Sequence, residues 1–102
     1  MYANWGSGNN ITYNTVINSN NWYYVVMTHE KDDSSNLYRF KLYLNGSLVG
    51  SDTRSISGAS EWYGPDPTFR IGLNWIGLID EIRLYNKVLT EEEILNNYNA
   101  SN

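Results

Sequence analysis

LYRFKLYLNGSLVGS, residues 37–51, alternates apolar and polar side chains and then turns back on itself. The alternation in residues 37–44 predicts a strand with Arg39 and Lys41 on one face and an apolar or aromatic set on the other. That set is Tyr38, Phe40, Leu42 and Leu44. Asn45-Gly46 follows directly, and because both central residues of a tight hairpin turn need a positive φ, this pair is a strong hairpin signal. Residues 47–51 are then the returning strand.

Strand-like runs continue on both sides of this hairpin. Residues 22–30 (WYYVVMTHE) are dense in β-branched and aromatic residues, which predicts an inner strand buried on both faces. Shorter runs occupy residues 11–17, 69–73 and 77–85, whereas residues 52–67 hold both prolines and are predicted to be irregular. Six such runs without helices between them predict an all-β protein.

One helix is predicted, and it lies at the C-terminal end. Thr90 and Glu93 have the spacing of a capping box, in which each side chain accepts a hydrogen bond from the backbone amide of the other residue. Leu89 and Ile94 have the spacing of a hydrophobic staple around that cap. The helix is expected to end near Asn99 and to pack on a sheet.

Composition excludes several classes of protein. The chain has 102 residues, the length of one domain, and a net charge of −4 without a cluster of Lys and Arg, which argues against a basic nucleic-acid interface. It has no cysteine, so disulfides, thiolate zinc sites and cysteine nucleophiles are absent. No apolar run approaches the length of a membrane span, and the N-terminus lacks the pattern of a signal peptide.

The chain is rich in residues that suit polar, flat ligands such as sugars. It has nine Tyr, four Trp and fifteen Asn, which offer flat apolar rings and both hydrogen-bond donors and acceptors. The same composition also follows from structure alone, since sheets favour Tyr and Trp and turns favour Asn.

Several segments together resemble the concanavalin A-like jelly rolls, most closely the laminin G-like type. Residues 22–28 resemble the Trp-led strand of that family, and residues 41–50 resemble its Asn-Gly hairpin. The C-terminal signature is matched by FRIG (residues 69–72), GLIDEIRLYN (residues 77–86) and the Leu89 to Ile94 region. The resemblance covers about residues 20–98.

The resemblance implies a two-sheet antiparallel sandwich with one short C-terminal helix. We therefore expect residues 1–102 to form a single, truncated domain of this type, without its usual N-terminal strands. The family implies a non-catalytic binding or adhesion module, with carbohydrate as the ligand, in an extracellular, virion or cell-surface setting. The alternative is a structural or assembly fragment of a larger surface or viral fibre protein, with no ligand of its own.

Half a jelly roll cannot cover its own apolar faces. A strand that is apolar on both sides needs a layer on each, and a second copy of the chain is the simplest supplier. We therefore expect a homo-oligomer that forms through an exposed sheet face or edge.

Loop aromatics are the candidate ligand-binding residues. Trp62, Tyr63, Asn74 and Trp75 lie beside predicted strand ends, where exposed rings would stack on sugars and Asn would bind hydroxyls. The alternative is that both tryptophans plug the ends of the core, because Trp is highly buried on average.

Two adjacent acids occupy the predicted strand at residues 77–85. Asp80 would share a face with Leu78, Ile82 and Leu84, whereas Glu81 would share the other with Ile79, Arg83 and Tyr85. Because paired catalytic carboxylates must meet at one sugar, this spacing argues against a glycosidase. Asp80 either binds calcium or is a buried acid satisfied by backbone amides, Arg70 or Arg83, and the second interpretation is favoured, so no cofactor is expected.

His29 is the only histidine of the chain. A catalytic triad would also need a nucleophile elbow, which the sequence lacks, and a zinc site built on histidines needs more than one. His29 is expected at the end of a strand, facing solvent or a turn.

Overall fold

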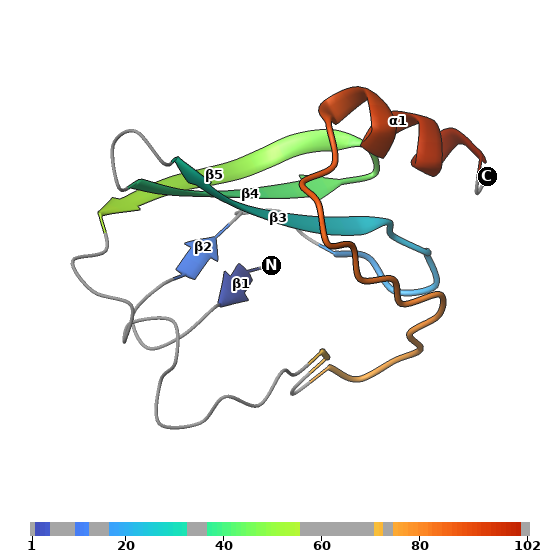
Figure 1. Cartoon of the computed structure of the whole chain (residues 1–102). Coiled ribbons are helices and arrows are strands. Elements are labelled where there is room, and N and C mark those ends of the chain that lie inside the picture. Colours follow the sequence, from blue (N-terminus) through green and yellow to red (C-terminus); the bar gives the residue numbers. More distant parts are fainter. Residues whose placement is uncertain are drawn as a thin grey trace.

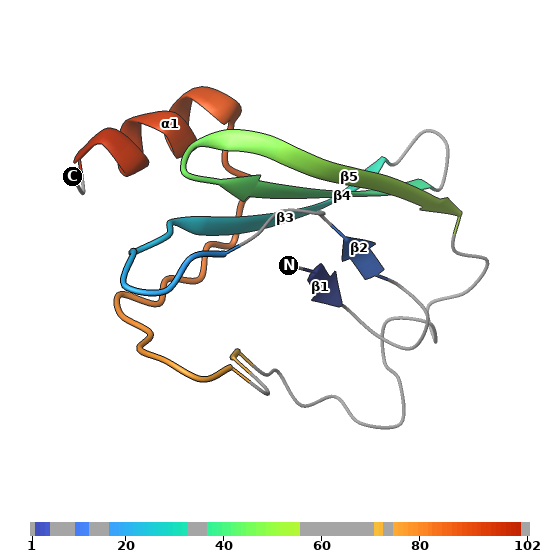
Figure 2. The ribbon, with the colours of Figure 1, turned by 180° about the vertical axis from the view of Figure 1, so that it is seen from behind.

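The computed structural model of the chain describes residues 2–4, 10–12, 17–32, 37–55, 71–72 and 75–100. The elements are β1 (Tyr2–Asn4), β2 (Asn10–Thr12), β3 (Val25–Asp32), β4 (Leu37–Leu44), β5 (Ser47–Ser55) and α1 (Glu91–Ala100). β3, β4 and β5 form an antiparallel sheet in that order, and β1 pairs with β2. α1 lies on one side of the larger sheet, and β1 and β2 lie on the other (Figures 1 and 2). The mostly-β prediction with one C-terminal helix is confirmed.

The turn between β4 and β5 forms as the sequence predicts, but β5 extends to Ser55, into residues that were predicted to be irregular. Asn45 and Gly46 both have positive φ, 50° and 83°, and Leu44 pairs with Ser47, so the two strands are joined by a type I′ turn. The turn is also anchored to the chain before β3, because the Tyr24 amide donates to Asn45 Oδ1 (2.9 Å) and the Asn45 amide donates to the Tyr24 carbonyl (2.8 Å).

A β-bulge in β5 changes which residues face the helix. Leu42 pairs with Gly50, but the next residue, Tyr43, pairs with Leu48, so Val49 is an extra residue in the ladder. Since directly opposed residues share a face, the bulge places Leu48 beside Tyr43.

The two faces of the larger sheet are covered by different elements. Phe40 and Leu42 are each 1% exposed and lie on the face away from α1. Tyr43 is buried on the other face, which we call the helix face, together with Leu89 and Ile94. The helix face also carries Arg39 and Lys41, so a face marked by two cations in the sequence has an apolar cluster at one end.

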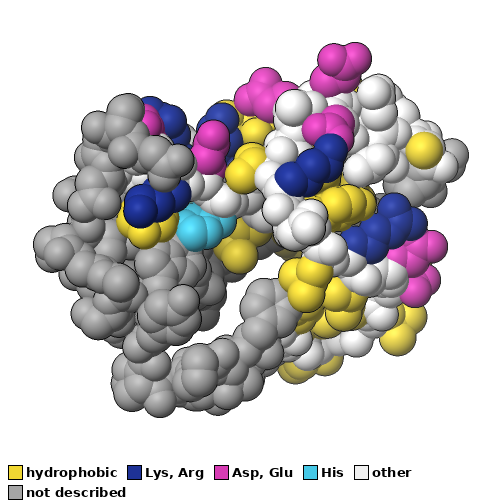
Figure 3. All heavy atoms as spheres, in the orientation of Figure 1, with side chains coloured by type: hydrophobic (Ala, Val, Ile, Leu, Met, Phe, Trp, Pro, Cys, Tyr) yellow, Lys and Arg dark blue, Asp and Glu magenta, His cyan; other side chains and the backbone are white. Residues whose placement is uncertain are grey.

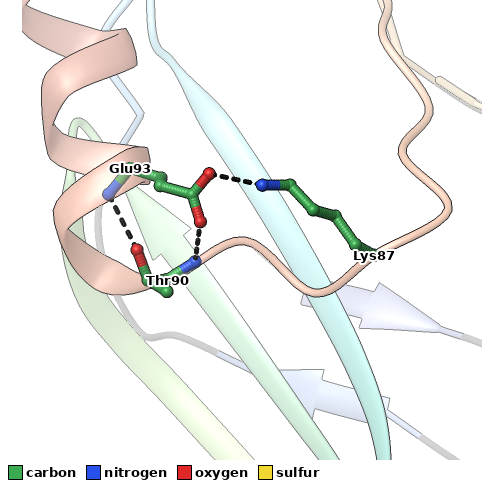
Figure 4. Close-up of polar contacts among 3 residues, drawn as sticks. All are labelled: Lys87, Thr90 and Glu93. Carbon is green, nitrogen blue, oxygen red and sulfur yellow. Dashed lines mark hydrogen bonds and ion pairs between the residues drawn. The ribbon is translucent and has the colours of Figure 1, made fainter.

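The predicted capping box and staple of α1 are confirmed. The Glu93 amide donates to Thr90 Oγ1, and the Thr90 amide donates to Glu93 Oε1, both at 3.1 Å (Figure 4). Lys87 Nζ donates to the second Glu93 oxygen at 2.7 Å, and this contact, with the Thr90 amide, lowers the pKa of Glu93. Leu89 and Ile94, the staple pair, are buried in one cluster.

The sequence prediction for residues 22–30 is wrong in two respects. The strand is Val25–Asp32, and it is not buried on both faces, because Val25 and Met27 are exposed and only Thr28 is buried. A strand is buried on both faces only where a layer covers each of them. Residues 11–17 are described only in part: β2 covers residues 10–12, residue 17 is not in a strand, and residues 13–16 lie outside the described residues.

The two predicted strands near the C-terminus are not strands in the structure. Residues 71–72 form a bend, the rest of residues 69–73 lie outside the described residues, and residues 77–85 are irregular. Gly72 and Glu81 have φ values of 76° and 53°, which are incompatible with an extended strand. An apolar alternating run becomes a strand only beside a partner strand, and none of the described strands pairs with residues 77–85.

His29 lies within β3 rather than at its end, and its imidazole stacks on two aromatic rings. Its ring centroid is 4.6 Å from that of Phe40 and 5.4 Å from that of Tyr38, and both stacks are nearly parallel. Desolvation by these neighbours lowers the pKa of His29 from 6.5 to about 4.

We expect His29 to make the protein less stable as the pH falls from 6.5 to 4. In that window the unfolded chain binds a proton that the folded chain does not, so the free energy of unfolding falls with pH, whereas above pH 6.5 the contribution is constant. The loss should be smaller than the full pKa difference implies, because the side chain stays exposed to solvent. Urea unfolding at pH 7 and pH 4.5 should show a weaker pH dependence for His29→Gln. Equal pH dependence in both proteins would contradict this assignment.

Candidate functional site

The candidate site is a hollow of about 230 Å³ on the helix face, between β3, β4 and the start of α1. We call it the polar trough. The residues that line it include Thr28, Glu30, Arg39, Lys41, Tyr43 and Glu91. Charged groups of both signs appear beside the helix on this side in Figure 3.

Strand pairing fixes the positions of the polar groups in the trough. Thr28 is directly opposite Lys41, and Glu30 is directly opposite Arg39, so four polar side chains project from neighbouring positions of one sheet face. Glu91, the first residue of α1, borders the trough from the helix. The charged side chains of the trough therefore project from regular elements, β3, β4 and α1.

Arg39 and Lys41 are held differently. Arg39 Nη2 lies 3.0 Å from Asp32 Oδ2, in an exposed ion pair on the same face. Lys41 and Glu30 make no hydrogen bond or ion pair with any other side chain that the structure describes. One cation and one carboxylate of the trough are thus available to a ligand.

Tyr43 is a buried residue that also lines the trough. Burial and the negative charge of Glu91 raise the pKa of Tyr43. The trough therefore offers donors from Lys41 and Arg39 and acceptors from Glu30 and Glu91, with hydroxyls that serve as either.

Of the four predicted ligand-binding residues, the structure describes only Trp75. Trp62, Tyr63 and Asn74 lie outside the described residues, and their role stays a prediction. Trp75 is 51% exposed and does not line the trough. Its indole lies over Gly77, where an added Cβ would be 3.0 Å from Trp75 Nε1. One part of its surface is thus against the backbone and the rest is open to solvent.

Asp80 is exposed, so the prediction that it is a buried acid is wrong. Its Oδ1 accepts a hydrogen bond from the Glu81 amide at 2.9 Å, which is the backbone partner that the sequence predicts. Arg83 pairs with Glu81 instead, at 3.4 Å. The part of the chain that the structure describes contains no group of three or more His, Cys, Asp or Glu that could hold a metal ion. Calcium binding by Asp80 stays a prediction.

Sequence reasoning missed the trough. Its strand residues occupy alternate positions of two strands, a pattern that is visible in the sequence as Thr28, Glu30, Arg39 and Lys41. Their meeting depends on the register of β3 against β4 and on the docking of α1, which no local pattern specifies.

In the described residues, no helix is long and apolar enough to cross a bilayer.

The comparison with known families matches this architecture. The sequence profile of the concanavalin A-like lectin/glucanases superfamily, in its laminin G-like form, matches residues 1–95. The chain belongs to this superfamily, which confirms the resemblance found in the sequence.

A solved structure shares the fold. The chain is similar to a crystal structure, at 2.1 Å resolution, of an S-layer domain-containing protein (residues 221–444) from Clostridium thermocellum, with a TM-score of 0.58 and 22% sequence identity. The similarity covers 88% of this chain and 45% of that one, so this chain spans less than half of the solved structure. No curated protein sequence matches the chain.

Proposed function

We propose that this chain is a non-catalytic binding module of a surface protein and that the polar trough holds a sugar residue of a glycan. The observation that carries the proposal is the pair of unengaged charges, Lys41 and Glu30, at neighbouring positions on the sheet face beside α1. Membership of a superfamily that includes lectins supports it.

The chemistry of the trough suits adjacent hydroxyl groups. A sugar hydroxyl accepts a hydrogen bond from Lys41 and donates one to Glu30, and each bond involves a charged group, which makes it stronger than a neutral one. The volume of about 230 Å³ fits one small polar ring rather than an extended ligand. We therefore propose recognition of one sugar residue, with the rest of the glycan outside the trough.

A glycan array followed by titration calorimetry tests the proposal. The array identifies the glycans that the wild-type chain binds. For these glycans, Lys41→Ala and Glu30→Gln should each raise the dissociation constant about tenfold or more, because each removes a charge-assisted hydrogen bond. Lys31→Ala is the matched control, because it also removes a lysine from the larger sheet. Lys31 belongs to β3 but lies on the face away from the trough, with its Nζ 5.9 Å from the Tyr38 ring centroid. This control should bind as the wild type does.

Trp75→Ala separates the two candidate sites. Loss of binding in Trp75→Ala with normal binding in Lys41→Ala would place the sugar at the loop aromatics and contradict the trough. A folded chain that binds no glycan would contradict carbohydrate binding altogether and favour the assembly fragment.

A further inference from the structure

The segment before α1 exposes an unusual amount of apolar surface. Every large apolar side chain of residues 75–88 is exposed, from 39% at Val88 to 98% at Ile76. Hydrophobic side chains gather at the lower right of the described part of the molecule (Figure 3). An exposed apolar segment of this extent marks an interaction surface.

This segment has the composition of a strand but lacks a partner. Residues 78–85 alternate in the manner of a strand, yet no backbone-to-backbone hydrogen bond joins residues 76–88 to another described residue. Glu81 has a φ of 53°, a left-handed conformation that is unfavourable for a residue with a side chain. Extended pairing with another strand would supply the missing hydrogen bonds and release Glu81 from this conformation.

One face of the segment is complementary to itself in antiparallel orientation, whereas the other face places Asp80 opposite Leu84. When two copies are aligned with Ile82 opposite Ile82, Glu81 stands opposite Arg83 of the second copy, and Arg83 opposite Glu81. In the same register Ile79 stands opposite Tyr85 of the second copy, twice. Directly opposed residues of opposite charge stabilise a strand pair, as do aromatic residues opposite β-branched ones. The single chain already holds Glu81 and Arg83 as an exposed ion pair, so both charges lie at the surface.

We propose that residues 78–86 of two copies of this chain pair as antiparallel strands around a two-fold axis at Ile82. A two-fold interface uses the same patch on both molecules, which fits the self-complementary order of charges and apolar residues.

The proposal does not depend on the polar trough. The trough is lined by strand residues of the helix face, Val88, Leu89 and the start of α1, and apart from Val88 none of these belongs to the exposed segment. A failure of glycan binding and a failure of dimerisation would therefore be separate results.

Charge reversal tests the pairing. Light scattering on a sizing column should give a dimer mass for the wild type, whereas Glu81→Arg and Arg83→Glu should each raise the dissociation constant about tenfold or more, because like charges then face each other twice. A mixture of the two variants should form a heterodimer, since opposite charges again face each other at both positions. Glu92→Arg, an equal change of charge at an exposed site on α1, should leave the dimer intact.

Cross-linking tests the axis and keeps the proposal falsifiable if the charge variants fold poorly. The chain has no cysteine, so Ile82→Cys places one thiol at the proposed axis, opposite its own copy, and oxidation should yield a disulfide-linked dimer. In Leu84→Cys the two thiols lie four residues apart along the paired strands and should not cross-link. A monomeric wild type, a dimer unaffected by Glu81→Arg, or equal cross-linking at both positions would overturn the proposal.

Discussion

Replacing Ile94 with alanine should lower the free energy of unfolding by about 2–5 kcal/mol, because it empties the centre of the cluster beneath α1. Ile94 is fully buried, at 0% exposure, and it packs with Tyr43 and Leu89. A domain of this size is stabilised by only about 5–15 kcal/mol, so the variant should unfold well below the wild-type temperature.

Deletion of residues 89–102 removes the whole helix side of the cluster and should leave an unfolded or insoluble chain.

Asn96→Ala is the control for this prediction. Asn96 lies on α1 at an exposed position, so its replacement should change stability little. Urea unfolding followed by circular dichroism measures the wild type and the three variants. A truncated chain that still melts cooperatively within a few degrees of the full chain would contradict a structural role for α1.

Replacing Gly46 with alanine should cost about 1–3 kcal/mol from two separate causes. Gly46 has a φ of 83°, where a side chain is strained, and an added Cβ would lie 2.9 Å from Leu95 Cδ1 and 3.2 Å from Tyr98 Cδ2. The turn and the helix are in contact here, so the strain reaches beyond the hairpin. Thermal unfolding of Gly46→Ala and of the exposed control Ser47→Ala measures the difference.

A double mutant separates the two causes. Leu95→Ala removes the nearest atom to the added Cβ, so in that background Gly46→Ala should cost less than it does alone, with the backbone strain and the contact with Tyr98 left. Strictly additive losses would show that Leu95 does not restrain the turn.

The parts of the fold that sequence predicts well are those whose causes lie close together in the chain. Asn45 and Gly46 specify the turn by their own backbone preferences, and Thr90 and Glu93 specify the helix start by hydrogen bonds three residues apart. Each of these signals is complete within a few residues.

Residues 77–85 show where local patterns fail. Their alternation resembles that of β4, but β4 has a neighbour on each side and residues 77–85 have none among the described strands. A strand is a property of a pair, and the pattern of one segment cannot supply the other. The site was missed for a related reason, because Lys41 and Glu30 become neighbours only through the register of two strands and the docking of a helix.

The anchoring of the Asn45-Gly46 turn has a consequence for how this chain can vary in length. The tips of hairpins are ordinarily where proteins accept inserted residues, affinity tags or new chain ends. Here the tip is bonded to Tyr24 through both the side chain and the backbone of Asn45, and Gly46 lies against α1. Lengthening this loop would break the contacts of the turn with Tyr24 and with α1 at the same time. We therefore expect insertions at the β4–β5 turn to destabilise the protein.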